Sequence, residues 1–270
     1  MKTLKKILQF DKVELQEFCK MFLEENNYKV INTKDYLYAK GDIPIMLVAH
    51  LDTVHTVPEK VYVDTKEKVM WSPTGIGGDD RCGVYAILKI LSKYRPYVLF
   101  TQDEEIGCVG AKEFIKDIKE PDLKYIIELD RRGSNDCVFY DCGNEEFQEY
   151  IKGFGFEKAF GSFTDIRAIS SEWDIASVNL SIGYQNEHTT SEIINFMDVI
   201  STIKKVCLML EDEKNAKKYD LQKQTQTYRY YYGNDYYQSK EYEEYIDWWD
   251  KKYAQQNSQK NKNKYEEKVK

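Results

Sequence analysis

The sequence lacks the features that would place it in a membrane, along a secretory route or among nucleic-acid binders. No apolar run approaches the roughly 20 residues that a helix needs to span a bilayer. The apolar stretch near the N-terminus is short and is broken at Asp11 and Lys12, so it does not resemble a signal peptide. The formal net charge of −7 leaves no broad basic face for nucleic acid. We therefore expect a cytoplasmic protein with neither membrane nor nucleic-acid partners.

Cysteine pairs with metal-binding spacing are also missing. The six cysteines are scattered and none forms a CxxC pair. Without a signal peptide, reduced thiols are expected. Cys137 and Cys142 lie closest in sequence, but no two further ligands accompany them, so both are expected to pack in the interior.

Leucine, isoleucine and valine become rare after residue 211. From 212 to 270 the chain is rich in tyrosine, lysine and glutamine. Such a segment cannot bury enough aliphatic surface to offset the entropy lost on ordering. We therefore predict one folded domain over residues 1–211 and a low-complexity tail over 212–270 that is disordered or partly helical. Residues 241–253 could form a short docking helix, whose partner is unknown.

Strands and helices alternate within the first 211 residues. Ile45–Ala49 and Tyr97–Thr101 have the length and composition of buried strands, whereas Lys12–Glu25 and Arg81–Tyr94 have helical spacing. This alternation predicts an α/β fold with a mixed, largely parallel central sheet and helices on both faces.

Histidine is scarce, with only three in the chain. His50 directly follows the strand predicted over Ile45–Ala49. Side chains just beyond the carboxyl ends of strands in an open α/β sheet converge on the ligand crevice. A neutral nitrogen of His50 could bind a metal there, and Asp52 could accept the other ring N–H. A loop histidine satisfied by its neighbours is the alternative. His55 is expected at the surface or in a substrate cleft.

Carboxylates follow a glycine-rich turn and two further predicted strands. Asp79 and Asp80 are adjacent among glycines, where they repel each other unless a cation or a donor offsets them. A helix N-cap at Asp80 is the simpler alternative. Glu104 and Glu105 follow the strand over 97–101, where one could bind a metal and the other take a proton from a water. A solvated acidic loop is the alternative for this pair.

Two more candidate ligands complete the set. Asp130 follows the strand predicted over Tyr125–Leu129, and His188 lies in the polar loop after the strand over Ala176–Ile182. Mixed histidine and carboxylate ligation suits zinc, and cobalt or manganese could replace it. A serine triad is disfavoured because Ser162 and Ser171 have no spare histidine.

Five motifs in chain order, HLDTV, GGDDRCG, DEEIGCVGA, ELD and NEHTTSE, resemble the zinc exopeptidase superfamily over roughly residues 45–210. This superfamily includes bacterial leucine-type aminopeptidases, peptidase T and amino-acid deacylases. The resemblance implies two divalent ions with five protein ligands: His50, Asp79, Asp130, Glu105 and His188. It implies that Asp79 bridges the two ions. His50 and Asp130 would bind one of them, and Glu105 and His188 the other. It further implies Glu104 as the general base and Asp52 as the partner of His50.

The resemblance implies a fold and an activity. The fold is a three-layer sandwich, and the activity is hydrolysis of peptide or amide bonds. The spacings from His50 to Asp79 and from Asp130 to His188 are too short for the lid or dimerisation domain of many relatives, so we expect the catalytic domain alone. An aminopeptidase acting on peptides is the first hypothesis. An N-acyl amino acid deacylase or a carboxypeptidase would share the site. A non-catalytic, metal-stabilised scaffold that acts through its tail is an alternative of another class. Substrate-binding residues stay unassigned, with Tyr184 and Arg131 as guesses.

Overall fold

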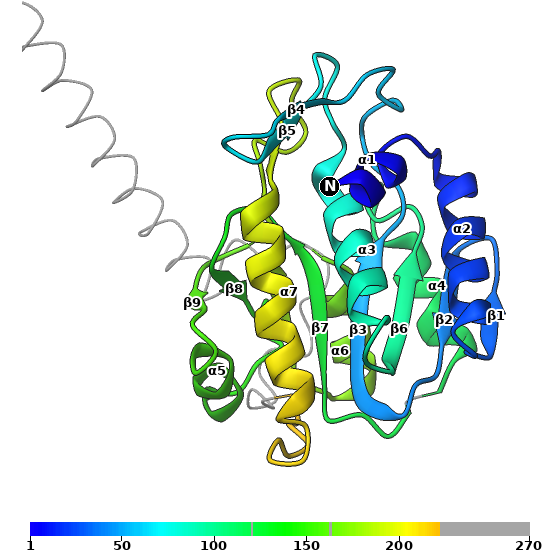
Figure 1. Cartoon of the computed structure of the whole chain (residues 1–270). Coiled ribbons are helices and arrows are strands. Elements are labelled where there is room, and N and C mark those ends of the chain that lie inside the picture. The colour runs from blue at the N-terminus through cyan, green and yellow to red at the C-terminus, as the bar shows by residue number, and fades with distance from the viewer. Residues whose placement is uncertain (120, 162–163, 222–270) are drawn as a thin grey trace, which may run out of the picture. The chain divides into compact units, whose positions relative to one another are not determined.

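The computed structural model describes residues 1–119, 121–161 and 164–221 (Figure 1). Every described residue belongs to one compact unit, Met1–Gln222. Most of the predicted tail, including the helix expected within 241–253, therefore lies outside the described residues. In the part that is described, no helix is both long and apolar enough to cross a membrane. The cytoplasmic location stays a prediction.

An eight-stranded sheet forms the centre of this unit (Figure 1). Its strands are β1 Val30–Asn32, β2 Tyr36–Ala39, β3 Ile43–His50, β6 Pro96–Thr101, β7 Tyr125–Arg131, β8 Asp136–Val138, β9 Glu157–Lys158 and β10 Ser177–Ser181. They lie in the order β1-β2-β6-β3-β7-β10-β8-β9. The central strands β6, β3, β7 and β10 run parallel. The pairs β1-β2, β2-β6 and β10-β8 are antiparallel, and β9 pairs parallel with β8. The mixed, largely parallel sheet expected from the sequence is confirmed.

A smaller antiparallel sheet lies beyond one end of the central strands, at the top of Figure 1. It consists of β4 Tyr62–Asp64, β5 Val69–Trp71, β11 Tyr184–Gln185 and β12 Ile193–Asn195, in the order β11-β12-β5-β4. The sequence predicts the hairpin of β4 and β5 but not its pairing with β12. The sequence predicts one long helix over Ser191–Leu210, whereas the structure forms β12 first because Ile193 and Ile194 pair with Trp71 and Met70.

Seven helices occur in the described ranges and cover both faces of the central sheet. They are α1 Lys2–Ile7, α2 Lys12–Glu25, α3 Gly78–Ile90, α4 Val109–Asp117, α5 Glu145–Lys152, α6 Asp165–Trp173 and α7 Phe196–Glu211. In Figure 1, α2, α3 and α7 lie in front of the sheet, and α4 and α6 lie behind it. α2 has the predicted bounds, since a capping box between Asp11 and Glu14 fixes its start.

The two-residue period of β3 divides its side chains between two cores. Ile45 and Leu47 point into the core beneath α3 and α7, whereas Met46 and Val48 point into the core that contains Phe114 of α4. All five side chains are fully buried. All six cysteines are free thiols and five of them are buried, including the two that were expected to pack. Helices on both faces are therefore confirmed, and they hold the strand ends in place.

The packing of the described chain continues past residue 211. Tyr219 packs against Tyr125 and Phe147, with ring centroids 6.1 and 5.0 Å away. The backbone N–H of Ala176 donates to the carbonyl of Tyr219 at 2.9 Å. Residues 212–221 thus add a short segment to the folded unit.

Candidate metal centre

The expected ligands lie at one edge of the central sheet. β3, β6 and β7 are parallel neighbours, so their carboxyl ends lie side by side. His50 is the last residue of β3, Asp130 lies near the end of β7, and Glu104 and Glu105 follow β6. This edge faces the crevice where open α/β sheets hold ligands.

His50, Asp79 and Asp130 form one group of possible metal ligands. Nε2 of His50 lies 3.1 Å from Oδ1 of Asp79 and 3.4 Å from Oδ1 of Asp130. The hydroxyl of Tyr184 also donates to Oδ1 of Asp130, at 3.0 Å. Because His50 is only 1 % exposed, it is held by the fold before any ion binds.

His188, Glu105 and Asp79 form a second group. Nε2 of His188 lies 3.1 Å from Oδ2 of Asp79 and 3.0 Å from Oε2 of Glu105. Asp79 therefore belongs to both groups and turns a different oxygen toward each histidine. One carboxylate with an oxygen for each of two cations is the arrangement that a two-metal site requires.

Asp52 and Glu104 lie beside these groups but in neither of them. Oδ1 of Asp52 lies 3.4 Å from Nδ1 of His50. The same carboxylate accepts the backbone N–H groups of Glu104 and Glu105, each at 3.2 Å. The Glu104 side chain has Cys108 as a neighbour, with Sγ 3.8 Å from Oε1. Asp52 thus joins the loop after β3 to the loop after β6.

The turn before α3 gives its two adjacent aspartates different roles. The Asp79–Asp80 peptide is cis, and Gly77 before it has the left-handed φ of 68°. Asp80 accepts the N–H of Gly83 at 2.8 Å, as a residue capping the regular part of α3 would. Asp79 is left to face the histidines. The N-cap alternative therefore holds for Asp80 and does not extend to Asp79.

Buried negative charge dominates the electrostatics of the site. Burial and the charge of Asp130 raise the pKa of Glu104 to about 9. Burial and the charge of Asp79 raise the pKa of Asp130 to about 7. Burial disfavours the charged form of His50, but the carboxylates led by Asp130 outweigh it and raise the His50 pKa well above its usual value. The hydrogen bond to Asp79 is the main reason that the pKa of His188 rises to about 9. Divalent cations would offset this excess of carboxylates.

Glu192 is a site residue that sequence reasoning missed. Its carboxylate is completely buried and accepts the N–H groups of Gly77 at 2.8 Å and Asp79 at 3.0 Å. The only available signal was an acidic residue inside the NEHTTSE motif. Its partners are backbone groups, which leave no mark in a sequence.

His55 and Arg132 lie near the candidate ligands but outside both groups. The His55 ring is mostly buried, with Nε2 3.2 Å from Oε2 of Glu192. It therefore does not lie on the open surface, and the alternative position in a substrate cleft stays a prediction. Arg132 forms an ion pair of 2.5 Å with Glu187, beside His188 in sequence. These contacts brace the loops that carry candidate ligands.

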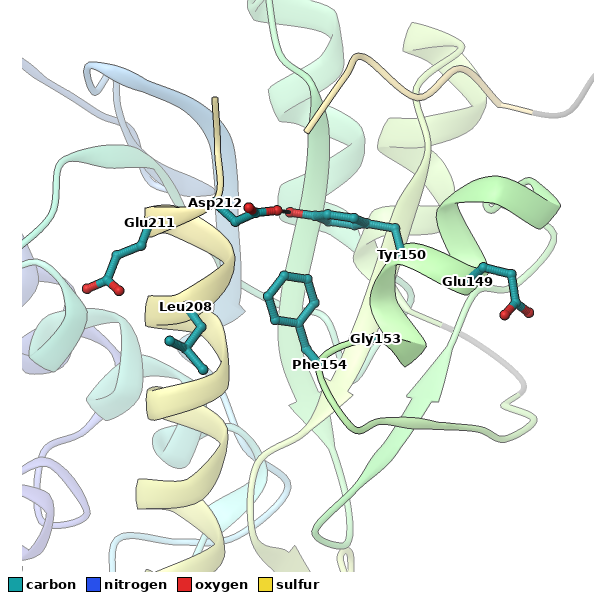
Figure 2. A pocket seen from close by; sticks show the side chains of 7 residues that line it. All are labelled: Glu149, Tyr150, Gly153, Phe154, Leu208, Glu211 and Asp212. Atoms are coloured by element: carbon teal, nitrogen blue, oxygen red, sulfur yellow. Dashed lines mark hydrogen bonds between the residues drawn. The ribbon is translucent and has the colours of Figure 1, made fainter. Parts of the chain in front are cut away.

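A separate hollow of about 650 Å³ lies between α5 and the end of α7 (Figure 2). It is lined by Glu149, Tyr150, Gly153, Phe154, Leu208, Glu211 and Asp212. Figure 2 shows the Tyr150 hydroxyl directed at Asp212, at 3.3 Å. None of the predicted site residues lines this hollow, so it is distinct from the metal centre.

Comparison with known proteins gives independent results on family and fold. The model of a protein family described as "Peptidase family M28" matches residues 31–162. That match includes all the candidate ligands except His188. No curated protein sequence matches the chain.

Solved structures of several peptidases share the fold. Aminopeptidase PepT of Bacillus cereus has a TM-score of 0.62 at 14 % identity, covering 79 % of this chain and 97 % of that one. A tripeptidase of Staphylococcus aureus has a TM-score of 0.64 at 14 % identity, with the same coverage of both chains. A TET aminopeptidase of a marine sediment archaeon of the Thaumarchaeota has a TM-score of 0.65 at 13 % identity, covering 80 % of this chain and 99 % of that one.

The chain resembles the exopeptidase superfamily in the family model that matches residues 31–162 and in the fold that it shares with these aminopeptidases. The resemblance expected from the five sequence motifs is confirmed. The chain is a hydrolase of the metallopeptidase type, and its activity class is metal-dependent hydrolysis of peptides. The described residues form the α/β fold that these aminopeptidases share, and the absence of a lid stays a prediction.

Proposed function

We propose that this metallopeptidase is a two-zinc exopeptidase of the aminopeptidase type. His50, Asp79 and Asp130 would hold one ion, and Asp79, Glu105 and His188 the other. The supporting observation is that the two oxygens of Asp79 face different histidines, each at 3.1 Å. The donors are imidazole nitrogens and carboxylate oxygens, a set that suits zinc and that also admits cobalt or manganese.

Glu104 is the residue that we propose as the general base. When bound, the two ions would lower the pKa of a water and stabilise the negative charge that develops on the substrate carbonyl. The Glu104 backbone is held by Asp52, and its side chain belongs to neither ligand group. Nearby cations favour the ionised carboxylate, so they would bring its pKa of about 9 down toward neutrality. Glu104 could then take a proton from water and pass it to the leaving nitrogen.

The relatives in fold support an amino-terminal substrate. The two groups and Glu104 contribute four carboxylates, whose charge two divalent ions would balance, so charge alone does not distinguish a free amine from a free carboxylate. The solved structures that share the fold include two aminopeptidases and a tripeptidase. We therefore propose peptides with a free amino terminus as substrates.

A matched set of chromogenic amides tests this function. The protein is stripped with a chelator, reloaded with Zn²⁺, Co²⁺ or Mn²⁺, and assayed on aminoacyl p-nitroanilides, their N-acetylated forms and N-acyl amino acids. We expect hydrolysis of the free-amine substrates only, and only with metal. Preferential cleavage of N-acyl amino acids would instead identify a deacylase. No turnover of any member at full metal occupancy would favour the scaffold hypothesis.

A further inference from the structure

Glu192 is a buried carboxylate whose hydrogen-bonding partners are the backbone of the turn that carries Asp79. It is 0 % exposed, and its two oxygens accept different N–H groups: Oε2 that of Gly77 at 2.8 Å and Oε1 that of Asp79 at 3.0 Å. A carboxylate can accept both bonds at once, whereas an amide side chain has one acceptor oxygen and would turn an N–H₂ toward one donor. The turn is therefore matched to a carboxylate.

Close packing fixes the turn against the Glu192 and His55 side chains. A Cβ atom on Gly75 would lie 2.2 Å from Nδ1 of His55, and a Cβ atom on Gly78 would lie 3.2 Å from Oε1 of Glu192. The same His55 ring reaches Glu192, with Nε2 3.2 Å from Oε2. Glycine at these positions allows the backbone to approach both side chains. The loop after β3, the turn before α3 and the segment before β12 thus meet at one carboxylate.

The position of Glu192 in the chain links it to both halves of the metal centre. It lies four residues after His188 and directly before β12, which is anchored by its pairing with β5. Through its bond to the Asp79 N–H, it connects the loop that carries His188 with the carboxylate that faces His188 at 3.1 Å. Asp79 also faces His50, so a shift of the turn would change both groups together.

We propose that Glu192 is a positioning residue that sets the orientation of Asp79 between the two metal sites, with the His55 ring packed beside it and against the turn. The proposal depends on the two-metal centre of the proposed function. It does not require Glu192 to touch an ion or a substrate. Partners that orient metal ligands typically change metal affinity or activity about 10- to 100-fold when they are replaced.

Cobalt titration of the full chain tests this role. Metal-free wild type and Glu192→Gln are titrated with Co²⁺, and the visible absorption of the bound ion reports the geometry of each site. We expect about 10- to 100-fold weaker binding of both ions in Glu192→Gln, with a changed cobalt spectrum. We also expect kcat to stay low when metal is saturating, because a misplaced Asp79 is not corrected by more metal.

Glu113→Gln is the matched control, since it makes the same change at a carboxylate of α4 that pairs with Lys116 on the same helix. It should keep the wild-type cobalt spectrum. If Glu192→Gln does not fold, His55→Phe provides the test, because phenylalanine keeps the ring against Gly75 and removes the nitrogen near Glu192. It should weaken cobalt binding in the same direction by a smaller factor.

The outcomes separate this proposal from the proposed function. A Glu192→Gln protein with lowered thermal stability but wild-type cobalt affinity and spectrum would overturn the positioning role and leave the enzyme intact. With Glu192→Gln unfolded, an unchanged cobalt titration of His55→Phe would overturn it equally. Wild type that binds no cobalt would contradict both proposals, whereas wild type that binds two ions without hydrolysing any substrate would contradict only the catalytic one.

Discussion

Replacement of Glu104 by glutamine should separate catalysis from stability and from metal binding. Burial raises the Glu104 pKa to about 9 in the metal-free protein, so its carboxyl is mostly protonated at pH 7. Glutamine has the same shape and is also neutral, so the free energy of unfolding of the metal-free variant should stay close to that of wild type. Glu104 lies outside both ligand groups, so two ions should still bind. Loss of a general base typically lowers the rate about 10²- to 10⁴-fold, which is about 2.7–5.4 kcal/mol in the activation barrier.

Three measurements on Glu104→Gln test this reasoning. Urea denaturation of the metal-free form gives the stability, elemental analysis gives the metal content, and hydrolysis of an aminoacyl p-nitroanilide gives kcat. Glu105→Gln is the comparison, because it removes a member of a ligand group and should lose metal as well as turnover. A Glu104→Gln protein with a kcat within about tenfold of wild type would fall short of the expected range for a general base and refute the assignment. Loss of metal from this variant would show instead that Glu104 is a ligand.

Other perturbations test the remaining parts of the structure. Chelation should lower the Tm more at pH 8 than at pH 5.5. The pKa values of Asp130, about 7, and His188, about 9, are raised in the metal-free fold, so proton binding to these groups stabilises that fold at low pH. This stabilisation is lost as the pH rises through the two values. A Tm difference between metal-loaded and metal-free protein that does not grow with pH would contradict this. Asp52→Asn leaves one of the N–H groups of Glu104 and Glu105 without an acceptor, so metal affinity or activity should fall about 10- to 100-fold. A variant with both wild-type cobalt binding and wild-type kcat would contradict this role of Asp52. Phe114→Ala should cost about 3–5 kcal/mol of unfolding free energy, because the ring is fully buried in the second core. Urea denaturation measures this cost, and cobalt binding by the folded variant should be unchanged.

The parts of the fold that were predictable are those in which local pattern and tertiary packing agree. The apolar run Ile45–Ala49 forms most of β3, and the spacing of Lys12–Glu25 coincides with α2, whose capping box is itself encoded in the sequence. The start of α7 was not predictable in this way. The residues after Ser191 look helical in isolation, but Ile193 and Ile194 pair with β5, and Asn195 then caps the helix through its bond to the Met197 N–H. Tertiary pairing overrides local preference at that point.

The same distinction applies to the candidate site. Its acidic and histidine side chains could be located because each follows a strand or a glycine-rich turn, and parallel neighbours bring strand ends together. Glu192 could not be located, because what defines its role is a pair of backbone N–H groups more than 100 positions earlier in the chain, at Gly77 and Asp79. Side chains that would bind ions are selected for their chemistry, which a sequence displays. A side chain that orients a ligand can be found in a sequence only when it lies close to that ligand along the chain, as Asp52 lies two residues after His50. Glu192 orients a turn more than 100 positions earlier, and only the folded chain displays that contact.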